Sequence, residues 1–469
     1  MGSNETTAPY TIRIYLRIKS DPFTQLENKY HRQYFSFRCI CQTPNNTAAQ
    51  LIFEILNAKD CSFPKAWLGT TVFVSTDLLS GWTRVSSTQY NSTMGHLIWS
   101  YNLQQSSIVG GSTILYFTYF PPYTYERHLH LISACASTAS KSIARVASLG
   151  KTLEGRDIDL VIVGFGPRIA WIIHRQHPGE TMAEFFAEGL LNRLLSLEFH
   201  TLQRDENVKG DDNVKTTAVE MFTFYIIPNM CPDGAVHGYL RTNANGSNLN
   251  REWASTRKYQ APTLERSPEV FYVLQEMDKT GVDVFVDVHG DESIPLNFIV
   301  GNEGLWDERL QALHGAFVGA YARANSDMQK IVSYKPVSTN TKHKNGKDKE
   351  KNNINLAIAS RQIAHRFQCL SVTLEMPFKD CLSNPDPIYG WSPDRARKLG
   401  ASLLEALVYV QPYLRMEGVT AKTFSSKDDT YILPTDRYED YFPTHTSSGT
   451  SSKYNIRSKK KTDGTRNTK

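Results

Sequence analysis

The hydrophobic pattern of the chain changes its period once, at Pro121 and Pro122, and this change limits the folds that the chain can form. Before the two prolines, short aromatic and β-branched runs alternate with turn formers, as in TIRIYLRI, QLIFEIL and HLIWSYNL. Such runs predict a small antiparallel β-sandwich. After the prolines, apolar strands such as DLVIVGF and MFTFYIIP alternate with helical stretches such as TMAEFFAEGLLNRLLSL. This alternation predicts an α/β domain with a mostly parallel or mixed sheet.

The length of 469 residues allows two folded domains with additional tails. We expect the sandwich over residues 8–122, the α/β domain over residues 123–415 and a basic, disordered tail over residues 416–469. Residues 451–469 hold seven Lys or Arg and one Asp, so the net charge of +5 lies almost entirely in this tail. A near-neutral body argues against a nucleic-acid partner, because such proteins spread basic side chains over a folded face.

The cysteines and the start of the chain favour a cytoplasmic protein. The seven cysteines are scattered and never form a CxxC pair, which argues against a disulfide framework or a thiolate metal site. No apolar run reaches the roughly 18 residues of a membrane span, and residues 1–10 lack the apolar core of a secretory signal. Gly2 begins a myristoylation pattern, and the lysines at 459–461 can add a second membrane signal. A membrane partner is therefore expected only if Gly2 is myristoylated.

Two histidines and two glutamates stand where predicted strands end. His177 and Glu180 lie at a turn from the strand RIAWIIH into a helix, so their side chains can face one point. Catalytic zinc takes three protein ligands and a water molecule, so a third ligand is needed. His289 supplies it at the end of DVFVDVHG, and Glu375 ends the strand LSVTLEMP. Each residue alone is more often a hydrogen-bonded core residue, but α/β sheets build sites at the carboxyl ends of strands, so we expect all four to meet.

A further segment, NMCPDGAVHGYLRTNANGSNLNREW, follows a predicted strand and adds polar side chains. It contains Arg241, Asn250 and Arg251 among turn-forming residues. One guanidinium can clamp a carboxylate through two parallel hydrogen bonds, and another can stabilise an oxyanion. Without the zinc ligands, a structural role for these arginines would be the better interpretation.

The motifs HPGE, PDG with a downstream Arg and NR, DVHGDE and TLEMPFKD resemble those of the zinc metallocarboxypeptidases. The chain is most similar to the cytosolic-carboxypeptidase-like subfamily, also named ATP/GTP-binding-protein-like, in the compact form of its bacterial members. The resemblance implies a mixed α/β sheet of the eight-stranded carboxypeptidase type, flanked by helices and preceded by the antiparallel sandwich. It also implies one Zn2+ per chain, bound by His177, Glu180 and His289.

The same resemblance implies a role for each remaining candidate. Glu375 would act as general base and proton shuttle for a water molecule that attacks the last peptide bond, and Arg241 would stabilise the oxyanion. Asn250 and Arg251 would hold the C-terminal carboxylate of a peptide or protein substrate. Some members remove glutamate, which needs a cation near the substrate side chain, and Arg361 is the candidate here. Tubulin tails would then be partners, and the reaction would be a deglutamylation.

One position departs from the family pattern. Many members carry an Asp two residues before the Asn-Arg pair, where it orients the first zinc-binding histidine, whereas this chain has Asn248. A neutral amide orients an imidazole without raising its basicity as a carboxylate does. Asp287 is one substitute to consider, although a structural role suits it better. His174 also precedes Glu180, but its spacing differs from that of the HPGE histidine.

Two other functions stay open on the sequence alone. One is a zinc-dependent acylase that cleaves small N-acyl amino acids with a similar ligand set. The other is a non-catalytic module that binds tubulin tails. The sequence does not decide the preferred C-terminal residue, the acceptance of branched polyglutamate or the oligomeric state. It also leaves open the roles of the tail and of the lysine-rich segment 342–351.

Overall fold

The computed structural model describes residues 10–424 with nine gaps. The gaps are residues 23–26, 28–29, 43–48, 104–111, 138–142, 197–211, 303–304, 306 and 335–353. Gly2, the lysine-rich segment 342–351 and residues 425–469 of the predicted tail lie outside the described residues. In the described part of the chain, no helix is both long and apolar enough to span a membrane.

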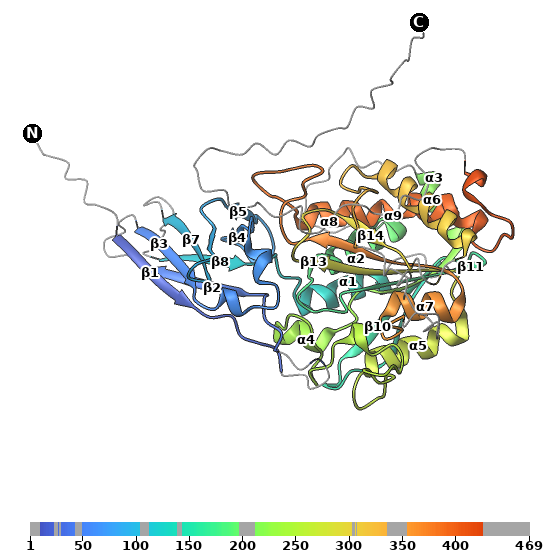
Figure 1. The fold of residues 1–469 in the computed structure, drawn as a ribbon, viewed down its shortest axis with the longest axis horizontal. Helices are drawn as coiled ribbons and strands as arrows, with labels where there is room; N and C mark the ends of the chain where they lie inside the picture. The colour runs from blue at the N-terminus through green and yellow to red at the C-terminus, as the bar shows by residue number, and fades with distance from the viewer. Residues whose placement is uncertain are drawn as a thin grey trace, which may run out of the picture.

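The first part of the chain forms a β-sandwich, drawn in blue in Figure 1. One sheet has the order β1-β3-β7-β6, and the other has the order β2-β8-β4-β5. The strands of the first sheet are β1 (Tyr10–Leu16), β3 (Ala49–Ile55), β7 (His96–Leu103) and β6 (Gln89–Asn91). Those of the second are β2 (Ser36–Gln42), β8 (Ser112–Thr118), β4 (Val72–Ser75) and β5 (Thr83–Val85). Phe53, Trp99 and Phe117 are fully buried between the sheets, so the alternation of apolar residues positioned these strands correctly.

One pairing in the sandwich differs from the antiparallel expectation. Strands β1 and β3 run parallel, whereas the other sandwich pairs are antiparallel. The reason is the chain path, because β2 in the opposite sheet lies between β1 and β3 in sequence. A direct hairpin would have forced antiparallel pairing, and the detour through the second sheet removes that constraint.

The second part is built on a mixed sheet of order β14-β15-β13-β11-β12-β10-β9. Its four central strands are parallel and its outer strands antiparallel, which confirms the predicted α/β class. The described residues supply seven strands, one fewer than the eight-stranded type. These strands are β9 (Ala144–Lys151), β10 (Asp157–Val163), β11 (Arg168–His174), β12 (Phe222–Ile227), β13 (Val284–Asp291), β14 (Phe298–Val300) and β15 (Leu370–Pro377).

Helices cover both faces of this sheet, because its central strands are apolar on both sides. One face packs against α1 (Tyr125–Ser137), α2 (Met182–Leu195), α6 (Glu308–Ala324), α8 (Pro393–Ala401) and α9 (Leu403–Val410). The other packs against α5 (Pro268–Thr280) and α7 (Ala359–Phe367). The remaining helices are α3 (Asp212–Met221) and α4 (Pro232–His237).

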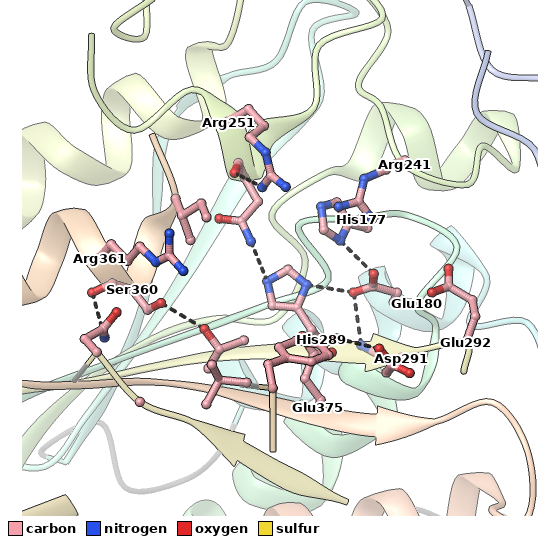
Figure 2. A pocket seen from close by; sticks show the side chains of 18 of the residues that line it. His177, Glu180, Arg241, Arg251, His289, Asp291, Glu292, Ser360, Arg361 and Glu375 are labelled. Carbon is pink, nitrogen blue, oxygen red and sulfur yellow. Dashed lines mark hydrogen bonds and ion pairs between the residues drawn. The ribbon is translucent and has the colours of Figure 1, made fainter. Parts of the chain in front are cut away.

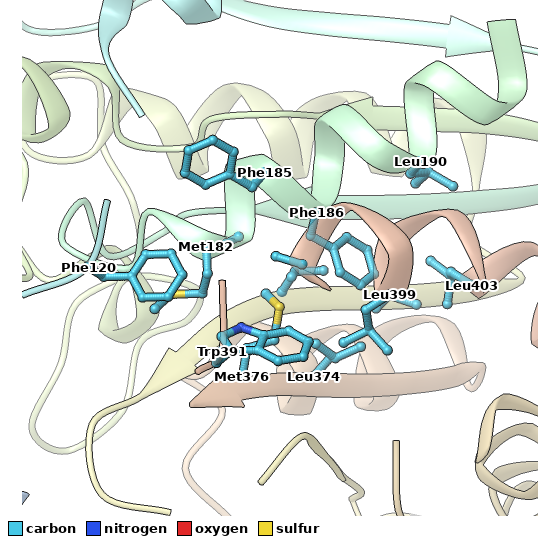
Figure 3. Close-up of a cluster of buried hydrophobic side chains, with 14 of the residues drawn as sticks. Phe120, Met182, Phe185, Phe186, Leu190, Leu374, Met376, Trp391, Leu399 and Leu403 are labelled. Carbon is cyan, nitrogen blue, oxygen red and sulfur yellow. The ribbon is translucent and has the colours of Figure 1, made fainter. Parts of the chain in front are cut away.

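Helices α2 and α8 cross closely above β15, as Figure 3 shows. Glycines at the crossing allow this, since a Cβ on Gly189 would lie 2.0 Å from the carbonyl oxygen of Arg397. A Cβ on Gly400 would likewise lie 2.1 Å from the carbonyl oxygen of Phe186. Side chains of α2 and α8 then pack on Leu374 and Met376 of β15. This packing fixes the strand that carries Glu375.

The sandwich and the α/β part share an interface at the end of β15. Arg84 of β5 donates hydrogen bonds to the carbonyl oxygens of Phe378 (3.0 Å) and Trp391 (2.9 Å). The ring of Phe378 stacks on Tyr119, with centroids 4.6 Å apart. Lys379 donates to the carbonyl oxygen of Leu68 across the same interface. The loop that follows Glu375 is therefore held by the sandwich.

Candidate metal centre

The carboxylate of Glu180 lies between two imidazoles. Its Oε1 is 2.6 Å from Nδ1 of His177, and its Oε2 is 2.8 Å from Nδ1 of His289. All three side chains are buried, and their potential ligand atoms lie within 4.8 Å of one another. Two imidazole nitrogens and one carboxylate oxygen form a ligand set of catalytic zinc, which leaves the fourth position open. The donor chemistry of this cluster therefore fits a zinc ion.

The strands explain how distant residues reach this point. His177 and Glu180 follow β11 and precede α2, and His289 lies within β13, the neighbour of β11. The backbone N–H of Gly290 also donates to Oε2 of Glu180, at 3.0 Å. The carboxyl ends of adjacent parallel strands thus carry the cluster, as expected for α/β sheets.

The remaining nitrogen of each imidazole has its own partner. Nε2 of His289 is 2.9 Å from Oδ2 of Asp287, two residues earlier on the same strand. Nε2 of His177 is 3.1 Å from Oδ1 of Asn248. Asp287 therefore does not replace the missing aspartate beside His177, because it hydrogen-bonds His289. These contacts leave Nδ1 of both imidazoles facing Glu180.

Glu375 lies directly beside His289, since the two residues are register partners on β13 and β15. Its Oε2 is buried and has no hydrogen-bond partner among the described residues. Burial raises the pKa of the Glu375 carboxyl well above its ordinary value, and the charge of His289 offsets this only in part. A buried carboxylate with an unused oxygen can accept a proton from a water molecule next to the cluster.

The long polar segment supplies three more side chains. Arg241 follows α4, and the 3-10 turn η5 (Leu249–Arg251) carries Asn250 and Arg251. The amide of Asn250 is oriented by its Oδ1, which accepts from the N–H of Ala359, and its Nδ2 lies 3.3 Å from Nε2 of His289. Arg251 donates to the carbonyl oxygen of Asn250 at 2.7 Å. The turn is therefore tied to the metal cluster and to α7.

Arg361 enters the same pocket from the first turn of α7. Ser360 anchors this turn to β15, since its hydroxyl accepts from Thr373 and its carbonyl accepts from Ser371. In Figure 2, Arg361 and Ser360 lie on the opposite side of His289 from Glu180. The guanidinium thus lies at a distance from the cluster along the pocket wall.

All eight residues selected from the sequence line one pocket, which Figure 2 shows. They are His177, Glu180, Arg241, Asn250, Arg251, His289, Arg361 and Glu375. His174 lies elsewhere, because its Nδ1 bonds the carbonyl oxygen of Ile227 at 2.8 Å, and burial lowers its pKa to about 3.

Sequence reasoning missed several residues around the pocket. Asp291 and Glu292, two and three residues after His289, also line it, and the hydroxyl of Tyr334 donates to the Asp291 carboxylate. The motif DVHGDE contains both acidic residues, so their place after the ligand histidine is the sequence signal that marks them. No sequence pattern marks Glu27, which reaches Asn248 from the segment between β1 and β2.

Metal-dependent hydrolysis needs metal ligands and a neighbouring base. This site provides two imidazoles and one carboxylate as ligands, with a second buried carboxylate beside them, at one edge of the sheet. The fold and the site thus place the molecule among the zinc-dependent hydrolases. A protein-family model described as zinc carboxypeptidase matches residues 132–390, more than half of the chain. The chain therefore belongs to that family. A model of the cytosolic carboxypeptidase N-terminal domain matches residues 3–120. The protein is therefore a metallocarboxypeptidase of this family.

Several known proteins are similar over most or part of the chain. An uncharacterized protein of Zymomonas mobilis is 39% identical over 87% of this chain and 93% of its own length. A metallo-carboxypeptidase from Pseudomonas aeruginosa, solved with (2-guanidinoethylmercapto)succinic acid, has a TM-score of 0.71. It is 34% identical and covers 88% of this chain and 96% of its own. Mouse cytosolic carboxypeptidase 6 is 27% identical over 42% of this chain and 35% of its own length.

Proposed function

We propose that the chain holds one zinc ion through His177, Glu180 and His289 and removes residues from the C-termini of peptides or proteins. The observation that carries this proposal is the shared pocket of the His-Glu-His cluster, Glu375 and three arginines. A small hydrolytic site needs only the cluster and a base. Three guanidinium groups around it suit a substrate that brings negative charge to the scissile bond.

When bound, zinc supplies Lewis-acid polarisation of the scissile carbonyl. In our proposal, Glu375 takes a proton from the attacking water molecule at its unpartnered Oε2 and passes it to the leaving amine. Burial raises the pKa of the Glu375 carboxyl, which makes the ionised form a stronger base for the water molecule.

In our proposal, the arginines bind different negative charges of the substrate. Arg241, which borders the cluster, would donate to the carbonyl oxygen as it becomes an oxyanion. Arg251 and Asn250 would bind the terminal carboxylate, and η5 holds them side by side. The fixed amide of Asn250 favours this role, since a preformed donor loses little freedom on binding.

We extend the proposal to acidic C-termini, with Arg361 facing a glutamate side chain. The position of Arg361 beyond Arg251 along the pocket wall supports this extension. Tubulin tails, which end in glutamate-rich sequence, would be one such substrate. We place the activity in the cytoplasm, where all seven cysteines, free in the structure, would stay reduced.

A peptide library with varied C-terminal residues, including Glu-ended members, tests this proposal by mass spectrometry. We expect stepwise loss of C-terminal residues, full inactivation by a chelator and recovery on adding zinc. Glu375→Gln should lower kcat by about 1000-fold, because general acid-base catalysis contributes about that much. Zinc content of the variant provides the control, since it should equal that of the wild type.

Two results would contradict the proposal. Cleavage of small N-acyl amino acids without any shortening of peptides would identify an acylase. Binding of glutamate-rich peptides, with no member of the library shortened, would identify a non-catalytic binding module.

A further inference from the structure

A hydrogen-bonded chain runs from the candidate zinc ligand His177 into the N-terminal part of the molecule. Nε2 of His177 lies 3.1 Å from Oδ1 of Asn248, and Nδ2 of Asn248 donates to Oε1 of Glu27 at 3.0 Å. Glu27 belongs to the segment that joins β1 to β2, 221 residues away from Asn248. The carboxylate that the sequence lacks beside His177 is thus present one side chain further out.

The orientation of the Asn248 amide is fixed by its other partner. Oδ1 also accepts a hydrogen bond from the backbone N–H of Asn250 at 3.2 Å. A flipped amide would place an NH2 group against that N–H and an oxygen against the Glu27 carboxylate, so both contacts would be lost. Because Oδ1 only accepts, Nε2 of His177 must carry the proton. His177 is therefore the tautomer that keeps Nδ1 free for a metal ion.

Glu27 is itself held firmly. Its Oε2 lies 2.7 Å from Nε2 of His31, whose side chain is fully buried. Nε of Arg251 lies 3.9 Å from Oε1. These contacts, together with the hydrogen bond from Asn248, leave the carboxylate little freedom to turn away. A fixed anion behind an amide polarises it and makes Oδ1 a stronger acceptor.

The second imidazole of the cluster, that of His289, differs from His177 because a carboxylate contacts it directly. Asp287 lies directly against Nε2 of His289, at 2.9 Å. A carboxylate in that position raises the basicity of a ligating imidazole and sets its orientation. The carboxylate of Glu27 acts on the basicity and orientation of His177 in the same way, but through the amide of Asn248.

We propose that Glu27 is a positioning residue for zinc binding, acting on His177 through Asn248. The inference rests on the proposed zinc site and goes beyond it, because it gives the N-terminal part of the chain a direct role in metal affinity. A second contact from the same segment supports this role. The carboxylate of Asp21 accepts from the backbone N–H groups of Leu240, Arg241 and Thr242, so this segment also shapes the loop beside the cluster.

The test is zinc affinity of the full chain, measured by competition with a chromophoric chelator and without any substrate. Glu27→Gln should bind zinc about 10-fold more weakly than the wild type, the usual effect of losing an outer carboxylate. Asn248→Ala should lose a similar amount, and the combined variant should lose no more than either alone. Glu54→Gln is the matched control, because Glu54 is a buried sandwich glutamate paired with Arg13 and His96. Its affinity should equal that of the wild type.

A charge exchange provides the sharper test. Asn248→Asp combined with Glu27→Gln moves the carboxylate next to His177 and leaves an amide behind it, so zinc affinity should return to within about 3-fold of the wild type. A purely structural role for Glu27 would predict no recovery. Melting temperatures of the metal-free variants show whether each one is folded.

The outcomes separate this inference from the proposed function. Wild-type zinc binding with equal affinity in Glu27→Gln would overturn the inference alone, and so would a charge exchange that stays as weak as Glu27→Gln. A wild type that binds no zinc would overturn both. Weaker binding in Glu27→Gln and Asn248→Ala, with recovery in the exchange, would support the relay.

Discussion

Arg361 occupies the third position of α7, where the helix start is bonded to β15 through Ser360. A guanidinium on a fixed turn can distinguish a charged ligand group from an apolar one, because its hydrogen bonds to a carboxylate are strong and directional. The three pocket arginines are therefore expected to differ in role. In our proposal, Arg241 and Arg251 would serve every substrate, whereas Arg361 would affect only the choice of the last residue.

Replacing Arg361 should change specificity more than rate. In Arg361→Met, we expect kcat/KM for Glu-ended peptides to fall about 10- to 100-fold, the value of a charged hydrogen bond. For Leu-ended peptides the change should stay below about 3-fold. Arg361→Lys is the matched variant, which keeps the charge and should recover part of the loss. An equal fall in kcat/KM for both peptide classes would show that Arg361 supports the fold and does not select the last residue.

Sequence reasoning found the site at the level of single residues where a strand end marked them. His177, His289 and Glu375 follow apolar runs, so their meeting at one edge could be predicted. The partners behind them could not be assigned, because hydrogen bonds such as that between Asn248 and Glu27 join segments 221 residues apart. Which imidazole Asp287 serves also depends on geometry that spacing does not contain.

At the scale of helices and strands, the long periodic segments were predicted well and the short ones were not. The apolar runs TIRIYLRI, QLIFEIL and HLIWSYNL became β1, β3 and β7, but β5 and β6, of three residues each, were missed because so short a run has no clear period. The run ARKLGASLLEALVYV has the pattern of one continuous helix, but the structure divides it at Ser402 into α8 and α9. The Ser402 hydroxyl bonds the carbonyl oxygen of Lys398, a contact that bends helices.

Three elements, α1, α2 and β10, meet at the buried side chain of His128. Its Nδ1 lies 2.7 Å from Glu184 of α2, and its Nε2 lies 3.0 Å from Asp159 of β10. Burial opposes the charged form, but the hydrogen bonds and charges of the two carboxylates outweigh it and raise the pKa of His128 to about 9. The native state therefore binds a proton that the unfolded chain has released at neutral pH.

The contribution of His128 to stability should depend on pH. Because its folded pKa lies above the unfolded value of about 6.5, the stabilisation is complete below pH ~6.5 and disappears as pH rises through about 9. The shift corresponds to about 3 kcal/mol in the free energy of unfolding. Urea unfolding at several pH values between 6 and ~9.5 should show this loss in the wild type and a flatter profile in His128→Gln. Parallel profiles would contradict this assignment.

At the scale of the whole molecule, Arg84 joins the two parts of the chain. Its guanidinium lies 3.7 Å from the centre of the Phe73 ring and donates to backbone carbonyls of the loop after Glu375. Burial lowers the pKa of Arg84 to about 9, which the charge of Asp380 opposes only in part. One side chain thus satisfies several buried carbonyl groups.

Removing this side chain should weaken the entire fold. For Arg84→Met we expect the free energy of unfolding to fall by about 3 kcal/mol, because several buried carbonyl groups lose their donor. Arg13→Met is the matched control, since Arg13 forms a partly exposed pair with Glu54, and it should cost less than about 1 kcal/mol. Urea unfolding measures both values. A variant with wild-type stability would show that the interface does not depend on Arg84.

The hydrogen bonds that Asp21 and Glu27 accept and that Arg84 donates also bear on how this protein can be divided or recombined. The zinc carboxypeptidase match covers residues 132–390, a natural choice for a minimal enzyme or a domain graft. Such a fragment would lack the acceptor of the Asn248 amide, the acceptor of three backbone N–H groups and the donor to the loop at Phe378. Residues 132–390 are therefore not a unit that can be transferred alone, and a chimera should exchange both parts of the chain together.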